Sequence, residues 1–168
     1  MKYAIAVSAA CLIAAVSVSA SSASAANDEA KIKTLEDQFA AAFNAKDLDG
    51  IMKVYAPDES LFVFDVIPPR QYVGASAYRK DWEGFLATFK GHAKMTLDDL
   101  AITNDGNLGF SRSTQHVTGT DTKGKPVDFT VRVTDGYKKT GGKWLIVQEH
   151  VSVPVNAETG VADMMSKP

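Results

Sequence analysis

The fold-defining stretch of the chain is Gly141-Gly142-Lys143-Trp144-Leu145-Ile146-Val147-Gln148-Glu149-His150-Val151-Ser152-Val153-Pro154, a strand that follows a glycine turn. Residues two apart on a strand share a face of the sheet. One face therefore runs from aromatic to titratable, through Trp144, Ile146, Gln148, His150 and Ser152. The other face is apolar apart from Glu149, which we interpret as structural or solvent-exposed. The mixture of aromatic and titratable residues on the first face predicts that this face forms the floor of a pocket.

The N-terminus predicts an export signal. Lys2 precedes an apolar run over residues 4–18, and Ala23-Ser24-Ala25 has the small-x-small pattern of a cleavage site, so the mature chain would begin at Ala26. The run is short for a membrane span. Cys11 lacks the large aliphatic residue three positions earlier that lipid attachment requires. We therefore expect an exported bacterial protein, periplasmic or secreted.

The composition of the mature chain excludes several function classes. Removing 25 of the 168 residues leaves 143, the size of one domain, and removes the only cysteine. Disulfides, thiol nucleophiles and thiolate metal sites are thereby excluded. Without Lys2 the formal net charge changes from −2 to about −3, which argues against nucleic acid or an anionic membrane as partner.

Helical periodicity is confined to the first half of the chain. Asn27 or Asp28 caps a predicted first helix, whose buried stripe recurs at helical spacing through Ile32, Leu35, Phe39 and Phe43. Asp47 caps a short second helix, and Gly74 or Ser76 opens a third. A short strand over 61–65 and a proline-containing loop separate the last two helices.

Strand patterns fill the second half of the chain. Alternating segments over 94–103, 108–120 and 127–138 precede the strand after Gly142, with turns between them. This order predicts an α+β fold, with helices laid on one face of a curved antiparallel sheet and a ligand site at its mouth. Residues 157–168 are predicted to form a tail.

Three segments resemble the SnoaL-like group of the NTF2-like superfamily, which includes ketosteroid isomerase relatives and polyketide cyclases. They cover residues 43–58, 74–82 and 132–154. The resemblance implies a SnoaL-like domain over 26–156 between a signal peptide, 1–25, and the tail. It also implies a cone in which three N-terminal helices pack on a curved, mainly antiparallel sheet, usually dimeric through the outer sheet face. It does not imply one reaction, because the fold hosts many functions.

Ketosteroid isomerases combine a carboxylate base with a tyrosine and a protonated aspartate as oxyanion donors. The resemblance places Asp65 at or near the base position, and Phe39 and Thr134 where the two donors would stand. Loss of one donor costs roughly 3 kcal/mol of transition-state stabilisation. We therefore predict that this chain is not a steroid isomerase.

Asp65 and His150 are the candidate catalytic residues. Asp65 ends an apolar strand and is interpreted either as a base or ligand acceptor at the pocket mouth, or as a cap of the Pro68-Pro69 turn. His150 is interpreted either as a general base or as a structural histidine bonded to Ser152.

The candidate ligand-binding residues are Tyr55, Trp82, Arg132, Trp144 and Ser152. Arg132 lies mid-strand between threonines and could pair with Asp65 or bind a ligand carboxylate; alternatively it belongs to a solvated outer face or a dimer interface. His92 and His116 have no partner at metal-ligand spacing, so we predict no metal site, and the pattern calls for no cofactor.

These observations leave three hypotheses. The first is an exported domain that binds a small apolar or amphipathic molecule, anchored by Asp65, Arg132 and His150. The second is a cofactor-free isomerase, dehydratase or cyclase with Asp65 or His150 as base. The third is a homodimeric association module without ligand. The first two require the three side chains to converge on an open cavity, whereas a filled cone with an exposed apolar sheet face would favour the third.

Overall fold

The computed structural model describes residues 11–166, with side chains from residue 24 onward, and confirms the α+β fold. Its elements in chain order are α1 (Cys11–Asn44), α2 (Leu48–Met52), β1 (Phe62–Phe64), β2 (Tyr72–Val73), α3 (Ala75–Ala87), β3 (Lys94–Asp105), β4 (Leu108–Thr120), β5 (Pro126–Thr140) and β6 (Lys143–Ser152). The predicted strand 108–120 agrees at both ends. The two-residue strand β2 was not predicted, because the prolines that precede it, Pro68 and Pro69, signal only a loop.

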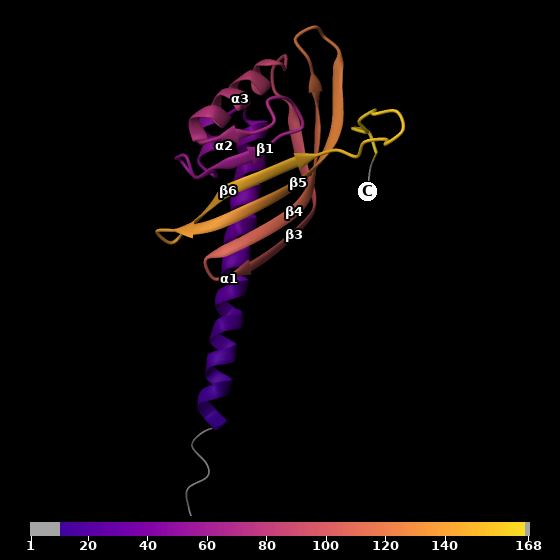
Figure 1. The fold of residues 1–168 in the computed structure, drawn as a ribbon. Helices are drawn as coiled ribbons and strands as arrows, with labels where there is room; N and C mark the ends of the chain where they lie inside the picture. The colour runs from indigo at the N-terminus through magenta and orange to yellow at the C-terminus, as the bar shows by residue number, and fades with distance from the viewer. Residues whose placement is uncertain (1–10, 167–168) are drawn as a thin grey trace, which may run out of the picture.

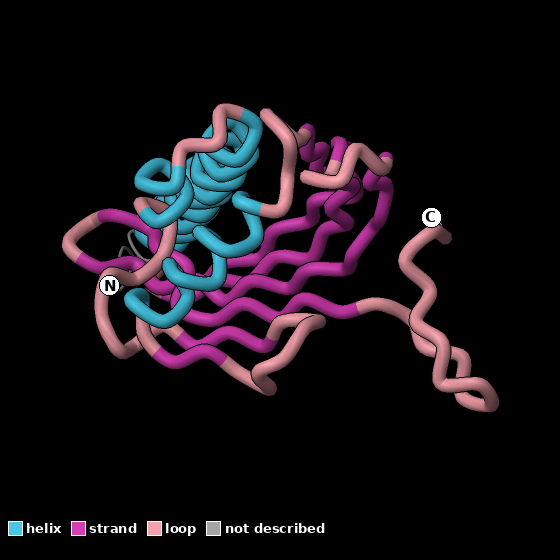
Figure 2. Tube along the Cα trace, turned by 90° about the horizontal axis from the view of Figure 1, so that it is seen from above, coloured by secondary structure: helices cyan, strands magenta, loops and turns pink. Residues whose placement is uncertain are grey.

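One curved sheet organises the domain. Its strand order is β2-β1-β6-β5-β4-β3, and all neighbours are antiparallel except β1 and β6. The three helices lie on one face of this sheet, and the opposite face is free of helices (Figures 1 and 2). The β-strand alternation therefore divides the side chains into an inner set facing the helices and an outer set facing away.

The inner set packs against an aromatic cluster. The predicted stripe of α1 is buried, with Phe39 2% and Phe43 1% exposed. Phe39 meets Tyr55 and Trp82 edge to face, at centroid distances of 6.2 and 5.5 Å. Such pairs add to the hydrophobic gain of burying large rings. Tyr78 and Trp82 of α3 complete the cluster, so α3 is held over the sheet by aromatic packing.

Helix α1 begins earlier than the predicted cap. Asn27 and Asp28 lie inside it, because the preceding run of alanine and serine contains no residue that breaks a helix. The first part of α1 extends beyond the edge of the sheet (Figure 1). The predicted signal peptide falls on this part and on residues 1–10, which lie outside the described residues. Among the helices of residues 11–166, none combines the length and apolarity needed to cross a membrane.

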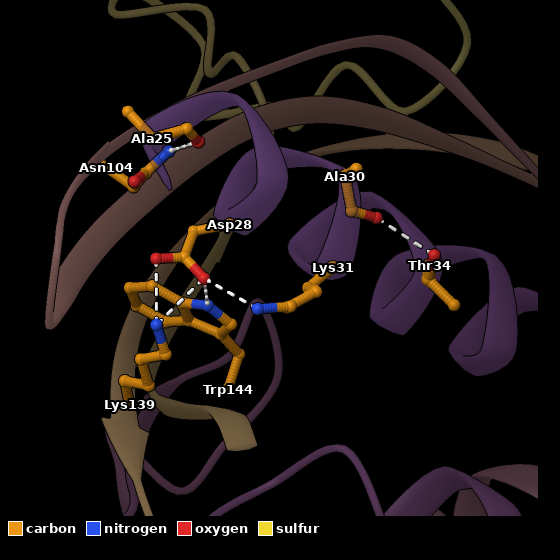
Figure 3. A network of polar contacts seen from close by, with 8 residues as sticks. All are labelled: Ala25, Asp28, Ala30, Lys31, Thr34, Asn104, Lys139 and Trp144. Carbon is orange, nitrogen blue, oxygen red and sulfur yellow. Dashed lines mark hydrogen bonds and ion pairs between the residues drawn. The ribbon is translucent and has the colours of Figure 1, made fainter. Parts of the chain in front are cut away.

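Asp28 fixes α1 to the last two strands (Figure 3). Its carboxylate accepts hydrogen bonds from Lys139 Nζ at 2.8 Å, Lys31 Nζ at 3.2 Å and Trp144 Nε1 at 3.3 Å. The bond from Lys139 is the main reason that the pKa of Asp28 is lowered to about 2. Trp144 is 5% exposed in this contact and borders a surface groove between α1 and the start of β6. It therefore lies apart from the other predicted ligand-binding residues.

A β-bulge in β6 changes which residues face the helices. Ile146 pairs with Tyr137 and Gln148 with Gly136, which leaves Val147 between them without a partner. An extra residue shifts the alternation of a strand by one position. Before the bulge the inner residues are even-numbered, as in Ile146, whereas after it they are odd-numbered, as in Glu149. The single face predicted for residues 144–152 is therefore wrong.

The segment after β6 forms an ordered arm instead of a simple tail. Val155 pairs with Ala162, and Asp163 N donates to Pro154 O at 2.8 Å, so the segment folds back on itself. Thr130 N of β5 donates to Met164 O at 2.8 Å and ties the arm to the sheet. The arm stands away from the helices (Figure 2).

Candidate functional site: a cavity with carboxyl groups

A cavity of about 190 Å³ lies between α3 and the inner face of the sheet. The loop after β1 and the C-terminal arm form part of its wall. The lining is mostly apolar, and its polar members are gathered in a small set: Asp65, Tyr78, Asp81, Gln115 and Glu149. The apolar members are Val66, Ile67, Trp82, Phe85, Met95, Val117, Phe129, Val131, Val151 and Met164. This combination is typical of small-molecule sites.

Glu149 is the most deeply buried carboxyl group of this lining. Its side chain is 3% exposed and accepts a hydrogen bond from Tyr55 Oη at 2.7 Å and another from Tyr78 Oη. Burial raises the pKa of Glu149 to about 7, although the two tyrosine hydroxyls oppose the shift. A group of this kind can hold or release a proton near neutral pH.

Asp135 stands directly behind Glu149. The two residues are register partners on β5 and β6, and Asp135 is 1% exposed. Its Oδ1 atom has no hydrogen-bond partner among the described residues. Burial, together with the charges of Glu149 and Glu36, raises the pKa of Asp135 well above its usual range. Burial therefore favours the neutral form of Asp135 beside Glu149.

A second polar chain continues toward α1. Tyr137 Oη donates to Glu36 Oε1 at 2.6 Å and lies 2.7 Å from Ser111 Oγ. Glu36 is 1% exposed, and burial raises its pKa. Three buried carboxyl groups thus lie between α1 and the sheet: Glu36 on α1, and Asp135 and Glu149 on the inner face of the sheet. No ion pair among the described residues involves them.

Asp65 lies at the cavity, as the sequence predicts. Burial raises its pKa, and the nearby Asp81 carboxylate adds to the shift. Its Oδ1 accepts a hydrogen bond from Val66 N at 2.5 Å, so it also caps the start of the proline loop. Both interpretations of Asp65 are therefore compatible with its position.

The other predicted residues fall into two groups. Trp82 lines the cavity, and Tyr55 lies behind it as a donor to Glu149. Arg132, His150 and Ser152 line a separate groove on the outer face of the sheet. The expected convergence of Asp65, Arg132 and His150 is therefore wrong, because Arg132 of β5 and His150 of β6 both lie on the outer face. The first two hypotheses do not hold in the form that requires these three residues in one cavity.

The inner face also changes the comparison with ketosteroid isomerases. Phe39 is buried in the aromatic cluster and supplies no hydroxyl group. Thr134 is exposed on the outer face, so it cannot stand where an acid would face the pocket. Its neighbour Asp135 faces inward instead. Asp135, however, is not among the residues that line the cavity.

Glu149 and Asp135 were missed by sequence reasoning, although one signal for Glu149 was visible. It interrupts an otherwise apolar strand face, a pattern that indicates a polar side chain buried in the core. Within residues 11–166 no group of three or more His, Cys, Asp and Glu side chains could hold a metal ion.

The sequence profile of the SnoaL-like domain matches residues 32–156. The chain belongs to the SnoaL-like domain family. A search of curated proteins finds no significant match. Among solved structures, an NTF2-like protein of unknown function from Pseudomonas putida is 29% identical, with a TM-score of 0.76 over 85% of this chain and 98% of that one.

More distant structures share the SnoaL-like architecture. A proposed scytalone dehydratase from Novosphingobium aromaticivorans superposes with a TM-score of 0.72 at 15% identity, over 88% of this chain and 99% of that one. A proposed dehydratase from Streptomyces avermitilis gives 0.66 at 16% identity, over 79% and 99%. At these identities the likeness concerns the fold alone, and it confirms the NTF2-like cone.

Proposed function

We propose that this SnoaL-like domain binds a small amphipathic molecule in the inner cavity. The observation that carries the proposal is a mainly apolar cavity, partly open to solvent, whose lining includes the carboxyl groups of Asp65 and Glu149. A cavity of roughly 150 Å³ is enough for benzene. The volume of about 190 Å³ therefore suits a molecule with one ring and a polar substituent.

The polar end of the cavity favours a neutral or cationic ligand. Its titratable lining residues are Asp65, Tyr78, Asp81 and Glu149, and no lysine, arginine or histidine is among the described lining residues. A ligand carboxylate would meet acceptors and no cation, which is costly in a buried site. A hydroxyl or ammonium group would instead donate to these oxygens.

Three ring compounds that differ in charge test this proposal. Titration calorimetry should detect binding of benzyl alcohol and benzylamine but not of benzoate. Val151→Phe fills the cavity from a half-buried position and should abolish binding, whereas Leu108→Phe on the exposed β4 terminus is the matched control. Equal binding of benzoate, or unchanged binding by Val151→Phe, would refute the proposal.

A second candidate function is acid–base catalysis in the same cavity. Two neighbouring carboxyl groups with raised pKa values support it, as do the dehydratase names of two structures with the same fold. In such a dehydration, Asp65 would take a proton from a carbon atom while Glu149 gives its proton to the departing hydroxyl group, which leaves as water. His150 takes no part, because it lies in the outer groove.

Proton exchange on a simple ketone separates catalysis from binding. Cyclohexanone in D₂O should exchange its α-protons faster with the protein than without it, as followed by NMR. Asp65→Asn should remove the acceleration, and Asp37→Asn on the exposed surface of α1 should not. Binding of benzyl alcohol without any exchange would leave a binding protein only.

Export and self-association remain proposals of the same kind. The extension of α1 beyond the sheet supports removal of a leader after Ala25, which the mass of protein recovered from a bacterial periplasm would test. A homodimer through the outer sheet face is proposed from the family resemblance, and such a dimer would cover the groove of that face. The polar outer face, with Arg112, Arg132 and His150, offers less support for a module that only associates.

A further inference from the structure

The outer face of the sheet carries a second cavity, unrelated to the proposed function of the inner one. This outer groove has a volume of about 650 Å³. Its floor is formed by β4, β5 and β6, and the C-terminal arm forms one wall. Most residues that line the groove are polar or charged: Asp99, Arg112, Ser113, Thr114, Thr130, Arg132, Thr134, His150, Ser152, Asp163 and Ser166. Val131, Val133 and Pro154 complete the lining.

Strand register brings three basic side chains together in the groove. Arg112 of β4 pairs with Thr134 of β5, which in turn pairs with His150 of β6. In the adjacent row, Arg132 lies between Thr114 and Ser152. Side chains on neighbouring strands one step off in register are separated by roughly 7–8 Å, within reach of long side chains. The two guanidinium groups and the imidazole can therefore converge on one ligand.

The two arginines of the groove form no ion pair with the carboxylates near them. Among the side chains that the structure describes, neither Arg112 nor Arg132 forms an ion pair, although the chain as a whole is acidic. Asp99 and Asp163 also line the groove. The Asp163 carboxylate accepts hydrogen bonds from Met165 N at 3.1 Å and Ser166 N at 2.9 Å, within its own turn.

Threonine and serine hydroxyl groups separate the two arginines and the histidine of the groove. Thr134 stands between Arg112 and His150, and Thr114 and Ser152 flank Arg132. Guanidinium forks and hydroxyl groups are the donors that proteins use to bind phosphate oxygens. We propose that the outer groove binds a phosphate group, either as a free phosphate or as part of a larger molecule.

Titration of the full chain with inorganic pyrophosphate tests the inference. The wild-type protein should bind it, and affinity should fall as salt is raised. Arg112→Ala and Arg132→Ala should each weaken binding by tenfold or more. Arg132→Lys keeps the charge but loses the fork and should give an intermediate loss. The matched control is Arg79→Ala, an exposed arginine on α3 that pairs with Asp49 and should change affinity less than twofold.

Thermal denaturation of each variant shows whether the loss is local, because these arginines are exposed and their removal should leave the melting temperature unchanged. Absence of binding, or an equal loss in Arg79→Ala, overturns the inference. A third outcome also overturns it: the wild-type protein is a dimer that does not bind pyrophosphate, and the double variant Arg112→Ala, Arg132→Ala is a monomer. The outer face would then be an interface between copies of the chain. If glycerol phosphate binds as tightly as inorganic phosphate, the natural ligand is a phosphate ester. If inorganic phosphate binds more tightly, the natural ligand is free phosphate.

Discussion

The two faces of one sheet show opposite arrangements of charge. The inner face of β5 and β6 buries acids, Asp135 and Glu149, which burial keeps protonated at higher pH than usual. The outer face of the same strands exposes Arg132 and His150 to solvent. Adjacent residues of one strand thus reside in environments of very different polarity. The comparison teaches that burial, and not the sequence neighbourhood, decides what a titratable residue does here.

The sharpest test of this comparison changes two consecutive residues of β5. Val133 is 2% exposed, so Val133→Asp places a new charge on the buried inner face. The buried acids nearby, Asp135 and Glu149, form no ion pair among the described residues. We expect a loss of more than about 4 kcal/mol of folding free energy, because an unpaired buried charge is among the costliest changes. Thr134→Asp on the exposed outer face should stay within about 0.5 kcal/mol. Urea denaturation followed by circular dichroism measures both, and similar losses would remove the distinction between the faces.

A second pair of variants compares phenylalanines. Phe39→Ala empties a site that is 2% exposed and touches two aromatic rings, so it should cost about 3–5 kcal/mol. Phe110→Ala on β4 changes a side chain that is 53% exposed and should cost less than about 1 kcal/mol. Melting temperatures by calorimetry would rank the two, and an equal decrease would mean that Phe110 is buried in solution.

The pH dependence of stability tests the buried acids directly. The pKa of Glu149 is raised from 4.5 to about 7, so between these values the unfolded chain releases a proton that the folded chain retains. Folding free energy should therefore decrease as pH rises through this window, by roughly 3 kcal/mol. The stabilisation by protonated Glu149 is fully present below pH 4.5, the lower of the two pKa values. Urea titrations at pH 5 and 7.5 measure it.

Glu149→Gln supplies the control for this titration. The amide cannot ionise, so the variant should lose much of the slope, while the raised pKa values of Asp65 and Asp135 maintain the remainder. Stability that increases from pH 5 to 7 in the wild type would contradict the buried, protonated state of these acids.

The smallest effect is expected from an ion pair on the outer face. His116 Nε2 lies 2.8 Å from Asp128 Oδ1, and the side chains are 30% and 54% exposed. Water screens such a pair, so Asp128→Asn should lower the folding free energy by no more than about 0.5 kcal/mol. A larger loss, measured by urea denaturation at pH 6, would show that the outer face contributes to stability as strongly as the inner one.

The fold was predictable because its signals are periodic and local. The stripe through Phe39 and Phe43 and the alternation over 108–120 each specify an element and its buried side. The start of α1 was not predictable from Asp28, because a good capping residue is equally compatible with a helix interior when alanines precede it. That boundary depends on context and not on the residue itself.

The candidate site was predictable only in part. Asp65 and Trp82 line the inner cavity, where Trp82 lies on helix α3 and Asp65 directly follows β1. Glu149 and His150 were exchanged between faces because a single unpaired residue, Val147, reverses the alternation. Nothing in the side chain of Val147 distinguishes it from a regular strand residue, since a bulge depends on how the neighbouring strand is aligned.

The C-terminal arm links the two cavities mechanically. Met164 contributes to the wall of the inner cavity, while Asp163 next to it borders the outer groove. The arm is tied to the sheet through the bond from Thr130 N to Met164 O. A molecule that displaced this segment from one side would reshape the other side as well, and thermodynamic linkage would then make the two affinities change by the same factor in both directions. A short segment of the C-terminal arm thus forms part of the wall of both cavities of the domain.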